Sequence, residues 1–127
     1  MKNKLLITVL VLVAFSSIIL SGCKKDKISA ARTTTYQLKV KDQLGISGSI
    51  SFTETSASIT TIEIALSGGS SQSHPAQIRL NSMVEGGSTS ITLNPVVGGN
   101  STTIVTSLDN NTSVNYSQLI LFDGYLN

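Results

Sequence analysis

The chain has 127 residues, of which 40% are hydrophobic and only 13% are charged, and its formal net charge is +2 at pH 7. Beyond residue 23 there are seven basic and seven acidic residues, and beyond residue 41 a single Arg79 faces six carboxylates. This length suits one small domain. The mildly acidic body excludes nucleic acid as a partner, because binding of phosphates requires clustered lysine and arginine.

The N-terminus carries Lys2 and Lys4, followed by a run of 16 weakly polar to apolar residues, 5–20. A membrane-spanning helix needs about 20 apolar residues, whereas the core of a signal peptide needs about 7–15 and ends at small residues. The run therefore predicts a signal peptide over residues 1–22. An uncleaved anchor helix and an ordinary secretory signal followed by a chance cysteine are the alternatives.

The only cysteine of the chain lies at the end of this run, in the sequence Leu20-Ser21-Gly22-Cys23. The motif resembles the lipobox of bacterial lipoproteins. In that family the cysteine thiolate forms a thioether with a diacylglycerol, and cleavage frees an amine that takes a further acyl chain such as palmitate. The resemblance implies lipid attachment at Cys23, which leaves no cysteine for a disulfide, a thiolate metal site or a catalytic thiol. Lys24 follows in place of the aspartate that marks inner-membrane retention, so we expect the outer membrane.

Residues 24–34 show no apolar periodicity, which predicts a flexible tether over residues 23–34. Its basic beginning, Lys24-Lys25-Asp26-Lys27, is interpreted as a solvated spacer. The alternative is a weak attraction to anionic headgroups, on the order of 1 kcal/mol per basic residue.

From Thr35 onward, apolar residues alternate with polar ones and helix formers are scarce. An alternation of period two places side chains on one face of half-buried strands. The groups expected to share a face are Tyr36, Leu38 and Val40; Ile46, Ile50 and Phe52; Ile62, Ile64 and Leu66; Ile78 and Leu80; Ile91 and Leu93; and Ile104 with Val105. Turn signals separate them at residues 42–45, 68–69, 74–75, 85–87, 98–100 and 109–111. Short strands at near-regular spacing predict an all-β antiparallel sandwich or barrel.

A different spacing appears at Tyr116, Leu119 and Ile120, where apolar residues recur every three or four positions. This spacing predicts a short helical turn near residues 116–121, with Asn115 or Ser117 as its N-cap. A buried strand is the alternative, because short apolar runs are ambiguous. The last three residues, 125–127, resemble the start of another strand.

Five sequence stretches resemble the chordin-type (CHRD) domain that some bacterial lipoproteins carry. They are His74-Pro75-Ala76-Gln77-Ile78-Arg79, Val84-Glu85-Gly86-Gly87, Ile91-Thr92-Leu93-Asn94-Pro95-Val96 and residues 119–127, with Gly48-Ser49-Ile50-Ser51-Phe52 as the early strand. The resemblance implies a CHRD-like domain over residues 35–127, built as an immunoglobulin-like or superoxide-dismutase-like Greek key. The chain ends before the family's later Val-His strand and lacks most of the family's histidines, so we expect a C-terminally shortened domain.

The single histidine, His74, is the one weak candidate for a metal ligand. Copper and zinc centres use three or four nitrogen, sulfur or oxygen ligands, and here Gln77 and the cationic Arg79 stand where the family has histidines. We therefore expect no metal and no cofactor, and we expect His74 in a turn or on the surface. Nucleophilic catalysis also needs a base and an orienting partner, for which His74 is the only candidate imidazole.

The carboxylates are scattered singly along the body. Glu54 and Glu63 could face each other across a hairpin, although solvated strand positions are the stronger interpretation. Asp109-Asn110-Asn111 could hold calcium, although turn chemistry accounts for these residues as well.

These observations predict a lipid-anchored, non-enzymatic binding or structural module of the cell envelope, with a protein or a glycan as its partner. A degenerate copper- or zinc-binding protein and an inactive truncated domain are the alternatives.

Overall fold

The computed structural model describes residues 30–39, 45–68 and 71–127. The expected signal peptide (1–22), the expected lipid-attachment residue Cys23 and the expected tether up to residue 29 lie outside these residues, as does Val40. Over the described ranges, the structure contains no helix with the length and apolar character needed to span a membrane.

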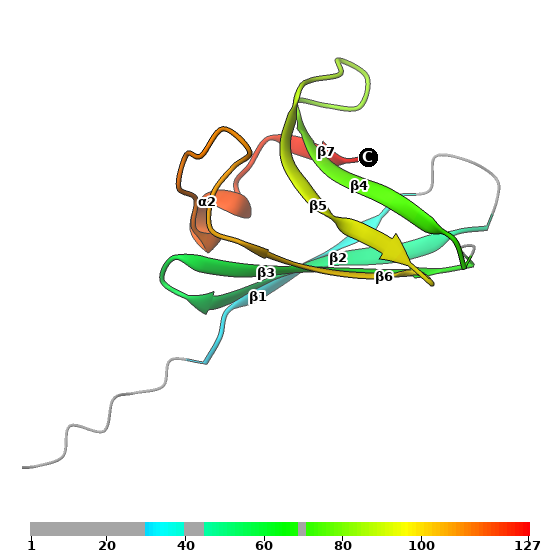
Figure 1. Ribbon diagram of the computed structural model, residues 1–127, viewed down its shortest axis with the longest axis horizontal. Coiled ribbons are helices and arrows are strands. Elements are labelled where there is room, and N and C mark those ends of the chain that lie inside the picture. Colours follow the sequence, from blue (N-terminus) through cyan, green and yellow to red (C-terminus); the bar gives the residue numbers. More distant parts are fainter. Residues whose placement is uncertain (1–29, 40–44, 69–70) are drawn as a thin grey trace, which may run out of the picture.

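The described residues form seven strands and one short helix (Figure 1). The elements are β1 (Thr33–Leu38), β2 (Ser47–Ser56), β3 (Ile59–Ser67), β4 (Ser73–Leu80), β5 (Thr89–Val97), β6 (Asn100–Val105), α2 (Tyr116–Leu119) and β7 (Gly124–Leu126). All pairings are antiparallel, and the strand order is β1-β2-β3-β6-β5-β4-β7. Since β3 lies beside β6, with β5 and β4 beyond, this part of the sheet has the order of a Greek key. The all-β prediction and the helical turn near 116–121 are confirmed.

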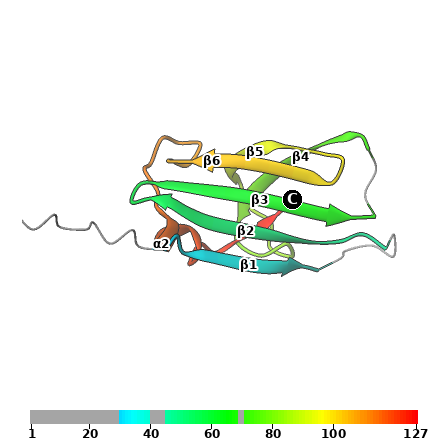
Figure 2. The ribbon, with the colours of Figure 1, turned by 90° about the horizontal axis from the view of Figure 1, so that it is seen from below.

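The sheet curls until its two halves face each other, with β1, β2, β3 and β6 in one layer and β4, β5 and β7 in the other (Figures 1 and 2). β5 and β6 pair only at Val97 and Asn100, around a turn in which Gly98 and Gly99 have φ of 58° and 85°. The two layers are therefore halves of one sheet, joined along one side, and β1 and β7 are its two end strands.

The hydrophobic core fills the space between the layers. In β3, for example, Thr60, Ile62 and Ile64 point inward and are 0%, 1% and 3% exposed. The buried apolar residues are Ile50, Phe52, Ile62, Ile64, Ala76, Ile78, Ile91, Leu93, Val96, Val105, Val114, Tyr116 and Leu119. Full burial of an aliphatic or phenylalanine side chain contributes about 1.5–3 kcal/mol, so this core is the main source of stability.

Two sequence expectations within this core region are wrong. Val105 is buried, but Ile104 is 70% exposed, because adjacent strand residues point to opposite faces. His74 and Pro75 do not form a turn but lie inside β4, where the register with β5 shifts between His74 and Ala76. A proline is accommodated in a strand at such an irregularity, and pairing with β5 there overrides its preference for turns.

The outer face of β1, β2 and β3 carries paired hydroxyl groups. Cross-strand hydroxyl contacts of 2.7–3.1 Å join Thr33 with Thr53, Thr35 with Ser51, Ser47 with Ser67, and Thr55 with Thr61. Such cross-strand pairs stabilise a sheet by a few tenths of a kcal/mol up to about 1 kcal/mol each. The abundant serine and threonine of the sequence therefore act as strand surface here.

Candidate binding groove

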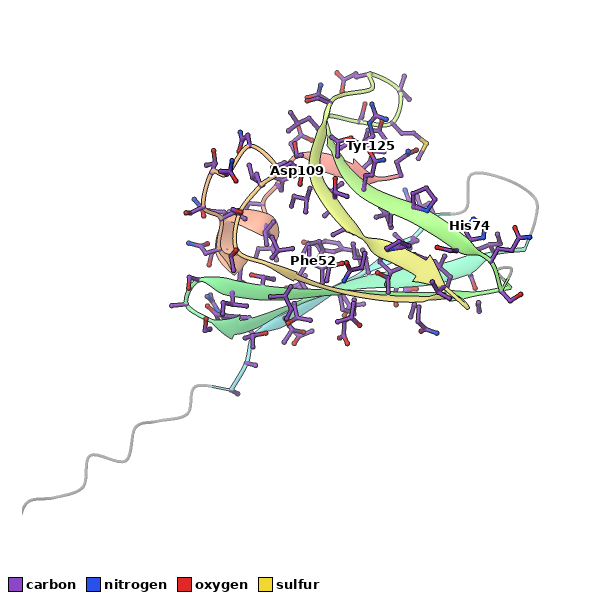
Figure 3. The ribbon with its side chains drawn as sticks, in the orientation of Figure 1. Phe52, His74, Asp109 and Tyr125 are labelled. Carbon is purple, nitrogen blue, oxygen red and sulfur yellow. The ribbon has the colours of Figure 1, made fainter. Side chains whose placement is uncertain are left out.

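An apolar groove lies on the side of the sandwich where the two layers are not joined. Its volume is about 300 Å³. It is lined by Tyr36, Leu38, Ile50, Phe52, Ile78, Leu119, Ile120, Phe122, Gly124, Tyr125 and Leu126. These residues come from both end strands, β1 and β7, and from β2, β4 and the α2 region. Figure 3 shows Phe52 pointing into the space between the layers.

The helix α2 is built to present its apolar residues to this space. The side chain of Asn115 accepts a hydrogen bond from the Gln118 N–H (3.1 Å), and the Gln118 Oε1 accepts one from the Asn115 N–H (3.0 Å). This reciprocal capping box compensates backbone donors that a helix start leaves unpaired. It fixes the orientation in which Tyr116 and Leu119 are buried, each 4% exposed. Of the two expected N-caps, Asn115 is correct.

Two hydroxyl contacts hold β1 against the α2 region. Thr34 Oγ1 and Tyr116 Oη share a hydrogen bond of 2.6 Å, and Tyr36 Oη donates one of 3.1 Å to the carbonyl oxygen of Ile120. The ring of Tyr36 also meets that of Phe52 edge to face, with centroids 6.0 Å apart and an interplanar angle of 84°. Edge-to-face pairs are the favoured aromatic geometry. Tyr36 is therefore oriented at the groove although it is 44% exposed.

An ion pair lies where β1 begins. Arg32 donates from Nε and Nη2 to the two carboxylate oxygens of Glu54, at 2.6 and 2.8 Å, and its guanidinium lies 4.9 Å from the centroid of the Tyr116 ring. The hydrogen bond from Arg32 lowers the pKa of Glu54 below its ordinary value, and Glu54 raises that of Arg32. The bidentate geometry and the stacked ring require arginine in particular. Sequence reasoning placed Arg32 in the tether, and no local pattern indicated its distant partners.

The candidate metal ligand His74 lies far from the α2 end of the molecule. It is exposed on β4, whereas Asp109 lies at the opposite end of the view in Figure 3. Over residues 30–39, 45–68 and 71–127, no three histidine, cysteine, aspartate or glutamate side chains come together as a metal site would require. The surface position expected for His74 is confirmed, and its place in a turn is not.

The other candidate acidic residues, Glu54, Glu63 and Asp109, do not form an acid–base pair or a shared cation site. Glu54 and Glu63 do not face each other, because the register pairs Glu54 with Thr60 and Glu63 with Ser51. The carboxylate of Asp109 accepts hydrogen bonds from the N–H and the hydroxyl of Thr92, at 2.9 and 2.8 Å.

The loop that follows β6 shows the expected turn chemistry. Asn110 Oδ1 accepts a hydrogen bond from the Thr112 N–H at 2.9 Å, and Asn111 has a left-handed φ of 66°. Asn111 also donates its backbone N–H to the carbonyl of Leu108. The turn interpretation of residues 109–111 is therefore confirmed.

A second hollow, wider and more polar, lies where the β2–β3 turn meets the loop before α2. It measures about 510 Å³ and is lined by Ala57, Ser58, Thr106, Ser107, Asn111, Ser113, Val114, Asn115 and Gln118. Two of its amide side chains, Asn115 and Gln118, are already engaged in the capping box. This engagement leaves the apolar groove as the stronger candidate.

Comparison of the chain with protein-family models, with curated proteins and with solved structures gave no match.

The groove itself could be predicted from the sequence only in part. The alternation of Tyr36, Leu38, Ile50 and Phe52 indicates that they share one face of neighbouring strands. That the segment 119–126 covers this face follows from tertiary structure alone.

Proposed function

We propose that this chain is a lipid-anchored protein of the bacterial cell envelope whose β-sandwich domain is a non-enzymatic binding module. The observation that supports it most is the apolar groove between the two end strands of the sheet. Concave, mostly apolar sites with a few placed polar groups are the common form of binding sites in proteins. The lining is aliphatic and aromatic, and the hydroxyl of Tyr36 within it is already bound to a backbone carbonyl.

The anchor rests on the sequence Leu20-Ser21-Gly22-Cys23. A diacylglycerol thioether on Cys23 and a further acyl chain on its amine anchor a protein stably, since each buried methylene contributes about 0.8 kcal/mol and one chain alone is marginal. The proposed location is the outer membrane, with the domain facing the periplasm or the cell surface. The resemblance to CHRD domains, with their proposed sandwich architecture, supports the same assignment.

The anchor is tested by a Cys23→Ser substitution in the native host or a lipoprotein-processing host. We expect the wild-type protein to take up radiolabelled palmitate and to sediment with membranes. The variant should lose the label and should either leave the membrane fraction or accumulate as the unprocessed precursor. A Ser21→Ala variant, which keeps a small residue at the cleavage site, is the matched control. A Cys23→Ser protein that stays membrane-bound at its mature size would contradict the proposal.

The binding role is tested by placing a photo-crosslinking amino acid at Tyr125, inside the groove, in intact cells. The control position is Ile104, which is exposed on the outer face of β6. We expect the crosslinker at Tyr125 to form one defined adduct with a protein or a glycan of the envelope. The crosslinker at Ile104 should not form that adduct. Identical adducts from both positions would contradict a specific role for the groove.

A further inference from the structure

The groove is bordered by two strand edges as well as by apolar side chains. β1 and β7 are the end strands of the sheet, and among the described residues no strand pairs with the outer edge of either. Tyr36 and Leu38 of β1 and the three residues of β7 line the groove. An unpaired edge presents a row of backbone donors and acceptors, which is a template for another strand.

The register shows which backbone groups of β1 point away from β2, toward the open edge of the sheet. Glu54 donates its backbone N–H to the carbonyl of Arg32, so these residues form a hydrogen-bonded pair. In an antiparallel ladder, hydrogen-bonded pairs alternate with non-hydrogen-bonded ones. The residues of β1 that bond to β2 are therefore Thr34, Tyr36 and Leu38. The residues whose N–H and C=O groups point away from β2 are therefore Thr33, Thr35 and Gln37.

The same reasoning applies to β7. Gln77 and Asn127 exchange both backbone hydrogen bonds, at 2.9 Å each. Tyr125, paired with Arg79, is the next hydrogen-bonded position, so Gly124 and Leu126 turn their backbone groups to the outer edge.

The partly exposed apolar side chains of the groove favour an occupant that makes apolar contacts with them. Phe122, Tyr125 and Leu126 are only partly buried, and Tyr36 is 44% exposed. An acyl chain would cover this floor but would leave the backbone groups of both edges without partners. An extended polypeptide supplies both kinds of contact, because its backbone pairs with an edge while alternate side chains point to one face.

We propose that the groove between β1 and β7 binds, in trans, an extended polypeptide segment with an apolar side chain at every second residue, by strand addition to the β1 edge. This inference rests on the proposed binding function and specifies its partner. β1 has six residues, which sets the length of the paired segment.

Among residues 24–127, the stretches outside the described part do not offer such a segment. Of the residues outside the described part that follow Cys23, the stretch 24–29 contains four charged residues, the stretch 40–44 lies between β1 and β2, and the stretch 69–70 lies between β3 and β4. A second copy would offer only its own edges, because its other strands are already paired. We assign the groove to a separate polypeptide segment, and a dimer formed through the β1 edge is a competing outcome of the test below.

The test uses the processed, lipidated protein in lipid nanodiscs. A display library of random peptides of about ten residues, long enough for one strand, is selected on it against empty nanodiscs. We expect the enriched peptides to share apolar residues at period two. A synthetic copy of the best peptide should bind at least about tenfold more tightly than the same peptide N-methylated at alternate residues, because N-methylation removes the pairing donors.

The protein side of the test compares Thr35→Pro with Thr35→Ala. Both lose the hydroxyl contact with Ser51, but only the proline lacks the outward N–H. We expect Thr35→Ala to bind the peptide within about twofold of the wild type, and Thr35→Pro to bind it about tenfold more weakly. If Thr35→Pro does not show a cooperative thermal transition, the variant is not folded. The affinity of the wild-type protein for the N-methylated peptide then tests the strand pairing.

Several results would overturn the inference. They are the absence of enriched peptides, enrichment without period two, and equal binding of the N-methylated peptide. Displacement by dodecanoate together with insensitivity to N-methylation would identify an acyl-chain site instead. A concentration-dependent dimer that Thr35→Pro abolishes would identify a second copy as the occupant. None of these results bears on palmitate labelling at Cys23 or on crosslinking from Tyr125, so the proposed anchor and binding role are tested separately.

Discussion

Thr34 Oγ1 lies 2.6 Å from the hydroxyl of Tyr116, and this hydrogen bond joins the first strand to a helix 82 positions later in the chain. Tyr116 is 4% exposed and the guanidinium of Arg32 lies over its ring. The contact therefore joins the end strand β1 to the helix α2, and both of these elements contribute residues to the lining of the groove.

Replacing Tyr116 with phenylalanine should lower the free energy of unfolding by about 0.5–1.5 kcal/mol, because it removes the hydrogen bond but keeps the buried ring. Urea unfolding followed by circular dichroism measures the change. Tyr36→Phe is the matched control and should cost less, since its bond to Ile120 is exposed. A double-mutant cycle with Thr34→Val should show that the two substitutions are not additive. Additive losses would mean that the contact contributes nothing.

The ion pair between Arg32 and Glu54 should make stability sensitive to acid. The pKa of Glu54 is lowered in the folded state by its hydrogen bond from Arg32, so the pair stabilises the fold above the unfolded pKa, about 4.5. This contribution is lost as the pH falls through the lower, folded pKa. Urea midpoints measured between about pH 7 and pH 2 should therefore fall less steeply in Glu54→Gln than in the wild type.

Glu63→Gln removes a carboxylate from the outer face of the same layer and is the control for the acid experiment. If Glu54→Gln and the wild type lose stability in parallel below about pH 4.5, the ion pair does not stabilise the fold in solution.

Alanine substitutions at Gly98 and Gly99 should differ although both glycines have positive φ. A Cβ at Gly98 would meet no atom within 4 Å, whereas one at Gly99 would lie 2.5 Å from the carbonyl oxygen of Leu66. We expect Gly98→Ala to cost about 1–2 kcal/mol through left-handed strain alone. Gly99→Ala should cost at least about 1 kcal/mol more, because the backbone of β3 must move. Equal thermal shifts for the two variants would contradict this geometry.

Asp109 should act as a structural anchor and not as a calcium ligand. Asp109→Ala removes two hydrogen bonds from Thr92 to a charged carboxylate, so we expect a loss of about 1.5–3 kcal/mol. Millimolar calcium and a chelator should leave the melting temperature of the wild type unchanged. A calcium-dependent rise that disappears in Asp109→Ala would show instead that residues 109–111 bind the ion.

The sequence by itself determined the local structure of this protein. Alternation in stretches such as Ile62 to Leu66 predicts strands because neighbouring side chains point to opposite faces. Glycine pairs such as Gly98-Gly99 mark turns that need positive φ, and Asn115 with Gln118 encodes a helix start through hydrogen bonds only three residues apart. These features depend on neighbours in the chain, so a linear pattern is sufficient to indicate them.

Only the tertiary structure decided which distant residues meet. It placed His74 and Pro75 inside a strand, turned Ile104 outward, and gave Glu54 the partner Arg32 instead of Glu63. Each outcome depends on strand register, where a shift of one residue exchanges the buried and exposed faces. The groove has the same origin, because β1 and β7 become its two edges only when the sheet curls (Figure 1) and brings residues of the segment 119–126 to the same groove as Phe52.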